Sequence, residues 1–215
     1  MKDLGGQVAY WDTVGAGKNF THPVEFDWLA EVRRDARVLD YGCGYGRVMG
    51  ELSDRGFSDV SGVDVSAALV ERGRALRPDL GFAVLESPPA SARPAASFDV
   101  IVVFAVLTCV PDDEAQRNLV AELTRILAPG GLLYVSDVLL QDDERNRERY
   151  AAHAQESGGP YGVFATGDGA VCRHHDIGHL HALLSDLDLV EERRIDVPTM
   201  NGNRCRAVQL LARKR

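Results

Sequence analysis

The sequence predicts an α/β protein built on an open, doubly wound and mostly parallel sheet. Short apolar segments alternate along the chain with amphipathic segments of helical period, which is typical of a parallel sheet covered by helices. Residues 98–104 are apolar on both faces, as in a central parallel strand. The composition, with 45% hydrophobic and 26% charged residues in 215, is that of an ordinary globular domain, so we expect one domain over 1–215.

The strands and helices of the first two thirds follow from apolar runs bounded by glycine and proline. We expect strands at 37–41, 59–64, 81–85, 98–104 and 132–136. Helices are expected at 48–55, at 67–77 and after Asp112. Ser66 can cap the second of these helices, and Pro78 ends it.

The two ends of the chain extend this core. Residues 8–13 and 23–32 predict helices, with Pro23 suited to a helix start, so we expect residues 1–34 to form an N-terminal helical lid. Towards the C-terminus the sequence predicts a charged helix at 143–155, a glycine-rich loop or small hairpin at 158–175, a helix capped by Asp176, and a pair of strands near 189–197 and 204–212 around Asn201-Gly202.

Charge and composition exclude several classes of partner. The 32 acidic and 24 basic residues give a net charge of −8, which disfavours binding to nucleic acid. No window of about 18 apolar residues predicts a membrane span, and the first residues lack the apolar core of a secretory signal. The four cysteines form no C-x-x-C pair, so we expect reduced thiols, no metal and a cytoplasmic protein. The sequence leaves monomer and homodimer open.

A glycine-rich turn between the first strand and the first core helix predicts a nucleotide-type cofactor. Gly42, Gly44 and Gly46 allow a tight turn that a ligand can approach closely. Asp64 ends the next strand 20 positions after Gly44, where a carboxylate can accept hydrogen bonds from ribose hydroxyls, although it can also serve as a helix cap. Arg47 stands where the dinucleotide pattern needs its third glycine, which disfavours a nicotinamide cofactor.

With Asp40 two residues before the first glycine, this G-x-G-x-G segment resembles motif I of the class I S-adenosylmethionine (SAM)-dependent methyltransferases. Phe98-Asp-Val-Ile is similar to the fourth strand of that family, and Leu127-Ala-Pro-Gly-Gly131 is similar to its helix-to-strand signature. The final pair of strands resembles its sixth and seventh strands. The resemblance implies a seven-stranded Rossmann-like sheet with an antiparallel last strand, SAM as cofactor and S-adenosylhomocysteine (SAH) as product.

The resemblance also implies a set of cofactor-binding residues. Asp40 would lie near the amino group of SAM, Asp64 would bind its ribose, and Val65 would pack on its adenine. Glu86-Ser87 would read the adenine amine. The methionine moiety and the remaining pocket wall would be formed by Gly42, Cys43, Gly44, Gly46, Phe104, Ala105 and Val106.

Two segments outside the core are candidates for the acceptor side. Residues 10–23 interleave aromatic residues with glycines, which suggests a mobile lid, although an N-terminal helix packed on the sheet is the alternative. Residues 141–176 form an insertion that, in the related enzymes, commonly covers the substrate. The candidate general bases, if one is needed, are His22, His174, His175 and Tyr10. A metal site at His175, His179 and His181 is a further alternative.

The reaction implied is direct in-line methyl transfer to a carbon, nitrogen or oxygen nucleophile of a small molecule, with an aromatic or indole acceptor of natural-product biosynthesis as one option. The segment after the fourth strand, Ala105-Val-Leu-Thr-Cys-Val-Pro111, differs from the Asn-Pro-Pro-Tyr type of nucleic-acid methyltransferases. Two alternatives stay open: an NAD(P)-dependent oxidoreductase, and a SAM-binding module without turnover.

Overall fold

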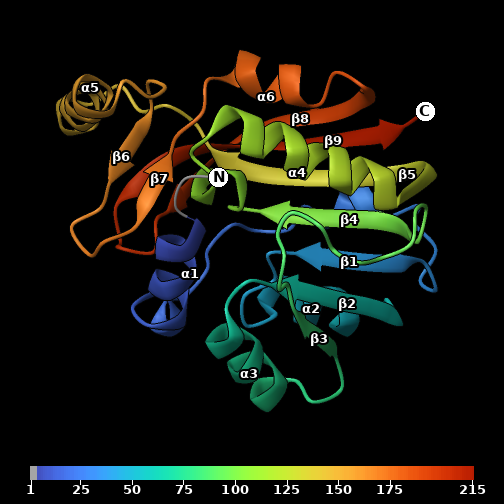
Figure 1. Ribbon diagram of the computed structural model, residues 1–215. Helices are drawn as coiled ribbons and strands as arrows, with labels where there is room; N and C mark the ends of the chain where they lie inside the picture. Colours follow the sequence, from blue (N-terminus) through green and yellow to red (C-terminus); the bar gives the residue numbers. More distant parts are fainter. Residues whose placement is uncertain (1–3) are drawn as a thin grey trace.

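The computed structural model describes residues 4–215 and consists of a seven-stranded sheet with helices on both faces (Figure 1). The strand order is β3-β2-β1-β4-β5-β9-β8. The bounds are β1 Arg37–Tyr41, β2 Asp59–Asp64, β3 Gly81–Val84, β4 Phe98–Phe104, β5 Leu127–Val138, β8 Leu187–Pro198 and β9 Arg204–Lys214. The first five strands are parallel, and β9 pairs antiparallel with both β5 and β8. The predicted doubly wound sheet with an antiparallel last strand is therefore confirmed.

The helices begin where the sequence supplies capping side chains. The bounds are α1 Leu4–Asp12, α2 Arg47–Asp54, α3 Ala67–Leu76, α4 Asp113–Ile126, α5 Glu144–Ser157 and α6 Ile177–Leu183. Ser66, Asp112 and Asp143 each accept a hydrogen bond from the backbone N–H three residues later, which satisfies a donor that the helix itself leaves free. Apolar side chains of α4 and α6 pack on one face of the sheet, and those of α2 pack on the other.

The predicted helix over 23–32 is wrong, because only a short 3-10 turn forms there, at Phe26–Leu29. The backbone groups that a helix would pair internally are bonded to side chains of the sheet instead. Pro23 O accepts a hydrogen bond from Gln209 Nε2 at 2.6 Å, and Glu25 N–H donates to Tyr134 Oη at 2.9 Å. These two bonds hold the segment in an extended path across β9 and β5.

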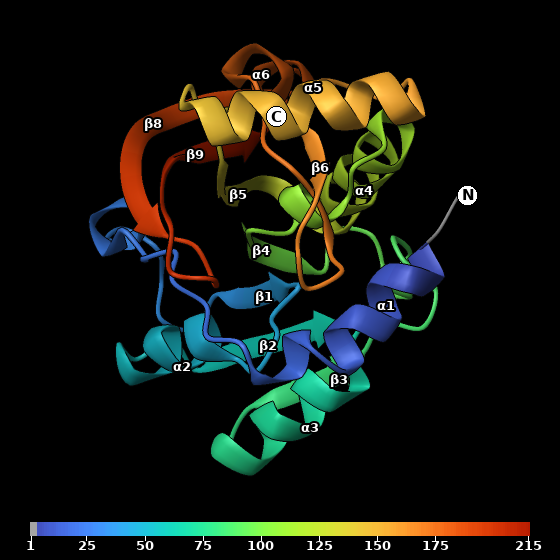
Figure 2. The ribbon, with the colours of Figure 1, turned by 90° about the vertical axis from the view of Figure 1, so that its left-hand side faces the viewer.

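The segment after β5 adds a small layer at the carboxyl ends of the parallel strands. Helix α5 is followed by a two-stranded hairpin of β6, Val163–Ala165, and β7, Val171–Arg173, which agrees with the predicted loop or hairpin. Figure 2 looks onto this edge of the sheet and shows the hairpin in front of β4, with α1 beside the hairpin on the β3 side. Segments from both ends of the chain therefore cover the place where the glycine-rich turn emerges.

Candidate functional site

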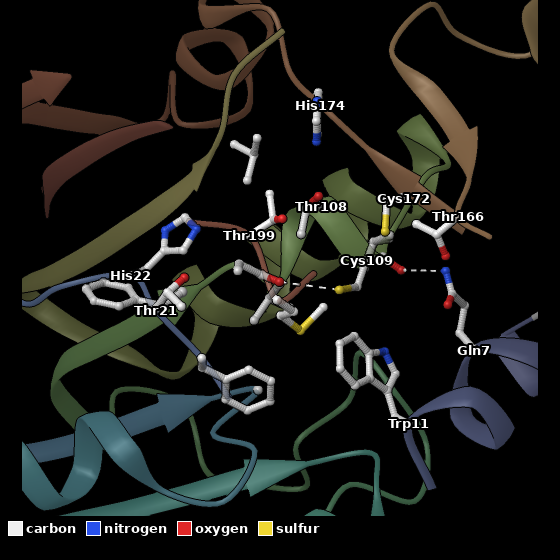
Figure 3. Close-up of a pocket in the computed structure, with 18 of the residues that line it drawn as sticks. Gln7, Trp11, Thr21, His22, Thr108, Cys109, Thr166, Cys172, His174 and Thr199 are labelled. Carbon is white, nitrogen blue, oxygen red and sulfur yellow. Dashed lines mark hydrogen bonds between the residues drawn. The ribbon is translucent and has the colours of Figure 1, made fainter. Parts of the chain in front are cut away.

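A cavity of about 660 Å³ lies at the carboxyl ends of β1, β4 and β5, beneath α1 and the β6–β7 hairpin (Figure 3). After β1 the chain adds β2 and β3 on one side of the sheet, and it then returns to place β4 on the other side of β1. The strand order therefore reverses between β1 and β4. Open α/β sheets bind ligands at such a reversal. The cavity also has the size of a small-molecule site.

The glycine-rich turn forms the floor of the cavity. Gly42 and Gly44 have φ of +80° and +54°, which is the left-handed region that favours glycine. The N–H groups of Gly42 and Cys43 both donate to Val63 O, at 2.8 and 3.0 Å, and so fix the turn against β2. A Cβ at Gly42 would collide with the Val106 side chain, and one at Gly44 would collide with Phe20. Gly42 and Cys43 line the cavity.

Asp64 lies beside this turn at the end of β2 and also lines the cavity. Its Oδ2 accepts from Gly44 N–H at 2.7 Å, and its Oδ1 accepts from Ser66 N–H at 2.9 Å. Burial raises the pKa of Asp64, and these backbone hydrogen bonds oppose that shift. The cap of α3 is Ser66, whose Oγ accepts from Leu69 N–H at 3.1 Å, so the alternative role of Asp64 as the cap is wrong.

Asp40 places a second carboxylate in the cavity. The residue is 2% exposed, and no donor among residues 4–215 makes a hydrogen bond to its side chain. Burial raises the pKa of Asp40 to about 7, although the nearby Arg47 opposes that rise. A buried carboxylate without a donor is destabilising on its own. The arrangement therefore suits a ligand that brings a cation or a donor to Asp40.

Two of the four candidate bases point into the cavity, as Figure 3 shows for His22 and His174. His22 Nδ1 lies 2.8 Å from Ser136 Oγ on β5. His174 Nδ1 lies 2.5 Å from Tyr150 Oη on α5. Burial lowers the pKa of His22 to about 4 and that of His174 to about 3, so both imidazoles are neutral at pH 7.

The other two candidate bases lie outside the cavity lining. His175 is buried beneath α6, where its Nε2 lies 2.8 Å from Gln116 Nε2 and its Nδ1 lies 3.3 Å from Val138 O. Tyr10 donates to Asp168 Oδ2 at 3.2 Å and so faces the β6–β7 turn. The structure does not bring either side chain to the carboxylates of the cofactor half.

The predicted adenine-binding pair also lies elsewhere. Glu86 and Ser87 are exposed, and the cavity is lined at this point by Leu85, Pro88 and Pro89 instead. Of the remaining predicted positions, Val65, Phe104, Ala105 and Val106 line the cavity, whereas Gly44 and Gly46 stand behind it. Gly46 has φ of +81° and precedes α2, so it serves the turn itself.

The imidazoles considered for a metal site do not converge. His175 and His179 stack at 5.9 Å between ring centroids, but both bond to Gln116, and His181 bonds to Glu192 at 2.7 Å. Within the part of the chain that the structure describes, no group of three or more His, Cys, Asp or Glu residues is arranged to hold a metal ion.

The far wall of the cavity contains residues that the sequence did not single out as site residues. Phe164 of β6 and Arg149 of α5 line it, together with Trp11 of α1, Thr108, Cys109 and Cys172 (Figure 3). Arg149 lies on the charged helix predicted at 143–155, inside the segment 141–176 that the sequence indicates as a candidate for the acceptor side, but it is not among the predicted site residues. The acids Asp40 and Asp64 belong to the half of the cavity next to β1 and β2, whereas Arg149 belongs to the half next to α5.

Comparison with known proteins agrees with this geometry. A family profile described as a methyltransferase domain matches residues 21–191. The chain belongs to the methyltransferase domain family. Its fold is that of the class I SAM-dependent methyltransferases, whose cofactor is SAM. A crystal structure of a SAM-dependent methyltransferase from Methanosarcina mazei superposes with a TM-score of 0.83, at 23% identity, over 90% of this chain and 99% of the other.

Curated relatives match about two thirds of the chain. Trans-aconitate 2-methyltransferase of Methylobacterium radiotolerans is 35% identical over 62% of this chain and 48% of its own length. The 27-O-demethylrifamycin SV methyltransferase of Amycolatopsis mediterranei is 30% identical over 69% of this chain and 64% of its own length. The chain thus spans about half to two thirds of these relatives. Among the described residues, no helix is long and apolar enough to cross a membrane.

Proposed function

We propose that the protein transfers the methyl group of SAM to a small-molecule acceptor bound in the same cavity. The observation that carries this proposal is the pair of buried carboxylates, Asp40 and Asp64, beside a glycine turn where the strand order reverses. The mostly apolar lining of the cavity supports a small acceptor, as does the kinship with methyltransferases named for rifamycin and ubiquinone biosynthesis.

The residues present fit SAM without rearrangement of the turn. Asp40, which has no hydrogen-bond donor within residues 4–215, would bind the ammonium of the methionine moiety. Asp64 would accept from the ribose hydroxyls with the lone pairs that its two backbone bonds leave free. At Gly42 there is no room for a Cβ beside Val106, so the turn at this point presents only backbone to the cavity. Val65 and Leu85 offer apolar surface to the adenine. When bound, the sulfonium supplies a methyl group that is already activated towards nucleophiles.

The protein therefore has to align the acceptor and exclude water. Trp11, Phe104 and Phe164 line the cavity with apolar surface, and α1 with the β6–β7 hairpin covers it. For an oxygen or nitrogen acceptor that must lose a proton, His22 would act as general base. Its partner Ser136 is paired with Phe104 at the end of β4, which places His22 close to the glycine turn. His174 lies further away, against α5.

His22 is free to accept a proton at neutral pH, but its lowered pKa makes it a weak base. With Nδ1–H donating to Ser136 Oγ, Nε2 is left as an acceptor that faces the cavity. Because the pKa of His22 is lowered to about 4 by burial, the imidazole is unprotonated throughout the neutral range. Replacement by glutamine should lower kcat by about 100-fold or more with SAH affinity unchanged. An unchanged kcat would remove His22 from the mechanism.

Calorimetry with SAH, and with NAD as a control ligand, tests the function. We expect SAH to bind, NAD not to bind, and Asp64→Ala to weaken SAH by at least about 100-fold, equivalent to about 2.7 kcal/mol. A screen of phenolic, indolic and carboxylic acceptors with methyl-labelled SAM would then detect transfer. Binding of NAD in place of SAH would favour an oxidoreductase. SAH binding without transfer to any acceptor would favour a binding module.

A further inference from the structure

Arg149 places a positive charge in the lining of the cavity. No carboxylate of residues 4–215 forms an ion pair with it. Its guanidinium lies over the Phe164 ring, with Cζ 3.4 Å from the ring centroid, and both residues line the cavity. Its Nε is buried and has no hydrogen-bond partner within residues 4–215. Over the same residues, no carboxylate lies within 4.0 Å of its nitrogens. Burial lowers the pKa of Arg149, the neighbouring Tyr150 hydroxyl opposes that shift, and the repulsion of Arg145 adds to it.

The other arginines with a buried, unpartnered Nε differ in this respect. Arg47 also lines the cavity, but its terminal nitrogens donate to Glu51 and to His22 O. Arg173 donates to Pro111 O at 3.0 Å and to Asp113 Oδ1 at 2.6 Å. In those two side chains the charge is balanced or bonded within the protein. Arg149 alone of the three keeps its charge available to the cavity.

A guanidinium stacked on a ring exposes its edge, where two parallel N–H groups match the two oxygens of a carboxylate. Arg145 lies one helical turn before Arg149 on α5 and lines the same end of the cavity. Asp143, the acid at this end, already accepts from Asn146 N–H and Nδ2. This end of the cavity therefore holds more positive than negative charge.

We propose that the methyl acceptor carries a carboxylate and that Arg149 binds it through a two-point hydrogen-bonded ion pair. This inference rests on the proposed function and adds the chemical class of the acceptor. Phe164 and Cys172, which line the cavity near Arg149, would contact the apolar body of the acceptor. The carboxylate would anchor one end of the molecule against α5, and its nucleophile would lie towards His22.

The position of Arg149 separates this role from binding of the cofactor carboxylate. Asp40 and Asp64 belong to β1 and β2, whereas Arg149 lies on α5 and packs on Phe164 of β6, in the layer that follows β5. Arg149 thus faces the far end of the cavity from the carboxylates that would hold SAM.

The test compares carboxylates with their neutral amides on the SAH-bound protein. Suitable pairs are 4-hydroxybenzoate with 4-hydroxybenzamide, indole-3-acetate with indole-3-acetamide, and benzoate with benzamide, measured by calorimetry at pH 7.5. In at least one pair we expect the carboxylate to bind tenfold or more tightly than the amide. Arg149→Met keeps the apolar stem against Phe164 and should abolish that preference. Arg149→Lys keeps the positive charge but not the two parallel N–H donors of the guanidinium. It should therefore retain part of the preference for the carboxylate.

Arg147→Met is the matched control, because Arg147 lies on the same helix, is exposed and does not line the cavity. It should bind every probe as the wild type does. Equal binding of carboxylate and amide in every pair would overturn the proposal, and so would a preference that survives Arg149→Met. Loss of SAH binding in Arg149→Met would reassign the side chain to the cofactor. Failure of the wild type to bind SAH would instead overturn the proposed function.

Discussion

The Lys18 ammonium lies 2.8 Å from Asp168 Oδ2 and at the same time 2.6 Å from Asn201 Oδ1. These three residues come from the N-terminal segment, the β6–β7 turn and the β8–β9 loop. Tyr10 and Thr166 also donate to Asp168, and the Lys18 hydrogen bond is the main cause that lowers the pKa of Asp168 well below its usual range. One lysine therefore joins the three segments that cover the cavity.

Lys18→Met should loosen this cover. We expect SAH to leave about tenfold faster, since losing the ion pair and its hydrogen bonds corresponds to about 1.4 kcal/mol. Stopped-flow fluorescence of Trp11, in a Trp28→Phe background, reports the release, because Trp11 lines the cavity. Lys214→Met is the control, since Lys214 bonds to Thr124 O and Leu127 O at the opposite end of the sheet. Equal release rates in the two variants would contradict the prediction.

Gly42→Ala should abolish cofactor binding because the added methyl group would change the shape of the cavity floor. The added methyl would meet Val106 at the cavity floor. Gly56→Ala is a matched control, because Gly56 has φ of +91° but open space where its Cβ would lie. Gly56→Ala should lose about 1–2 kcal/mol of unfolding free energy in urea melts, since alanine disfavours the left-handed region, and Gly42→Ala should lose more because of the collision with Val106. Calorimetry should show loss of SAH binding only in Gly42→Ala.

SAH affinity should rise with pH through the titration of Asp40. Its carboxylate has to be ionised to bind the ammonium of SAH, and burial raises the pKa of Asp40 to about 7 in the free protein. Between pH 6 and pH 5 the affinity should therefore fall close to tenfold, whereas it should be nearly constant from pH 8 to pH 8.5. Asp40→Asn should bind weakly and without this dependence. A flat profile in the wild type would exclude Asp40 as the ammonium ligand.

The same carboxylate should lower the stability of the ligand-free protein at high pH. Because the folded-state pKa of about 7 lies above the unfolded value of about 3.9, the unfolded state binds fewer protons between these values. Stability contributed at this site is therefore lost as the pH rises from about 4 to about 7. Urea unfolding should show Asp40→Asn more stable than wild type at pH 8, by up to about 4 kcal/mol. At pH 4 the difference should be close to zero.

The rate of transfer should be insensitive to the usual histidine titration. Burial lowers the pKa of His22 to about 4, so its neutral form persists down to that pH. At saturating SAM and acceptor, kcat should stay level from pH 8 to about pH 5 and fall below it. A drop centred near pH 6.5 would indicate that another group is the base.

Local sequence patterns predicted the core strands well, because each is a buried run between glycines or prolines. β1, β2 and β4 have the predicted bounds, and the fifth strand is longer than expected because it already pairs with Phe98 at Leu127. The helix prediction for residues 23–32 was wrong for a non-local reason. Its backbone partners, Gln209 and Tyr134, are more than 100 positions away along the chain, which no local pattern reveals.

The site residues also divide into those that local sequence predicts and those that depend on distant contacts. Those on the glycine-rich turn between β1 and α2 follow from local spacing, whereas those on the added segments depend on tertiary placement. His174 and His175 are neighbours in sequence, yet successive side chains of an extended segment point to opposite sides. One therefore reaches the cavity and the other the core beneath α6. Arg149 looks like a solvated residue until Phe164 is placed under it.

Helix α1 holds both halves of the cavity closed. At its end, Asp12 Oδ1 accepts from Ser66 Oγ at 2.8 Å, beside Asp64, the proposed ribose ligand. At its start, the Gln7 amide donates to Val171 O of the hairpin that walls the acceptor half. Movement of α1 away from the cavity would open both of its halves at once. SAH and the methylated product would then leave through the same opening. The rate of turnover would depend on how often α1 moves away from the cavity.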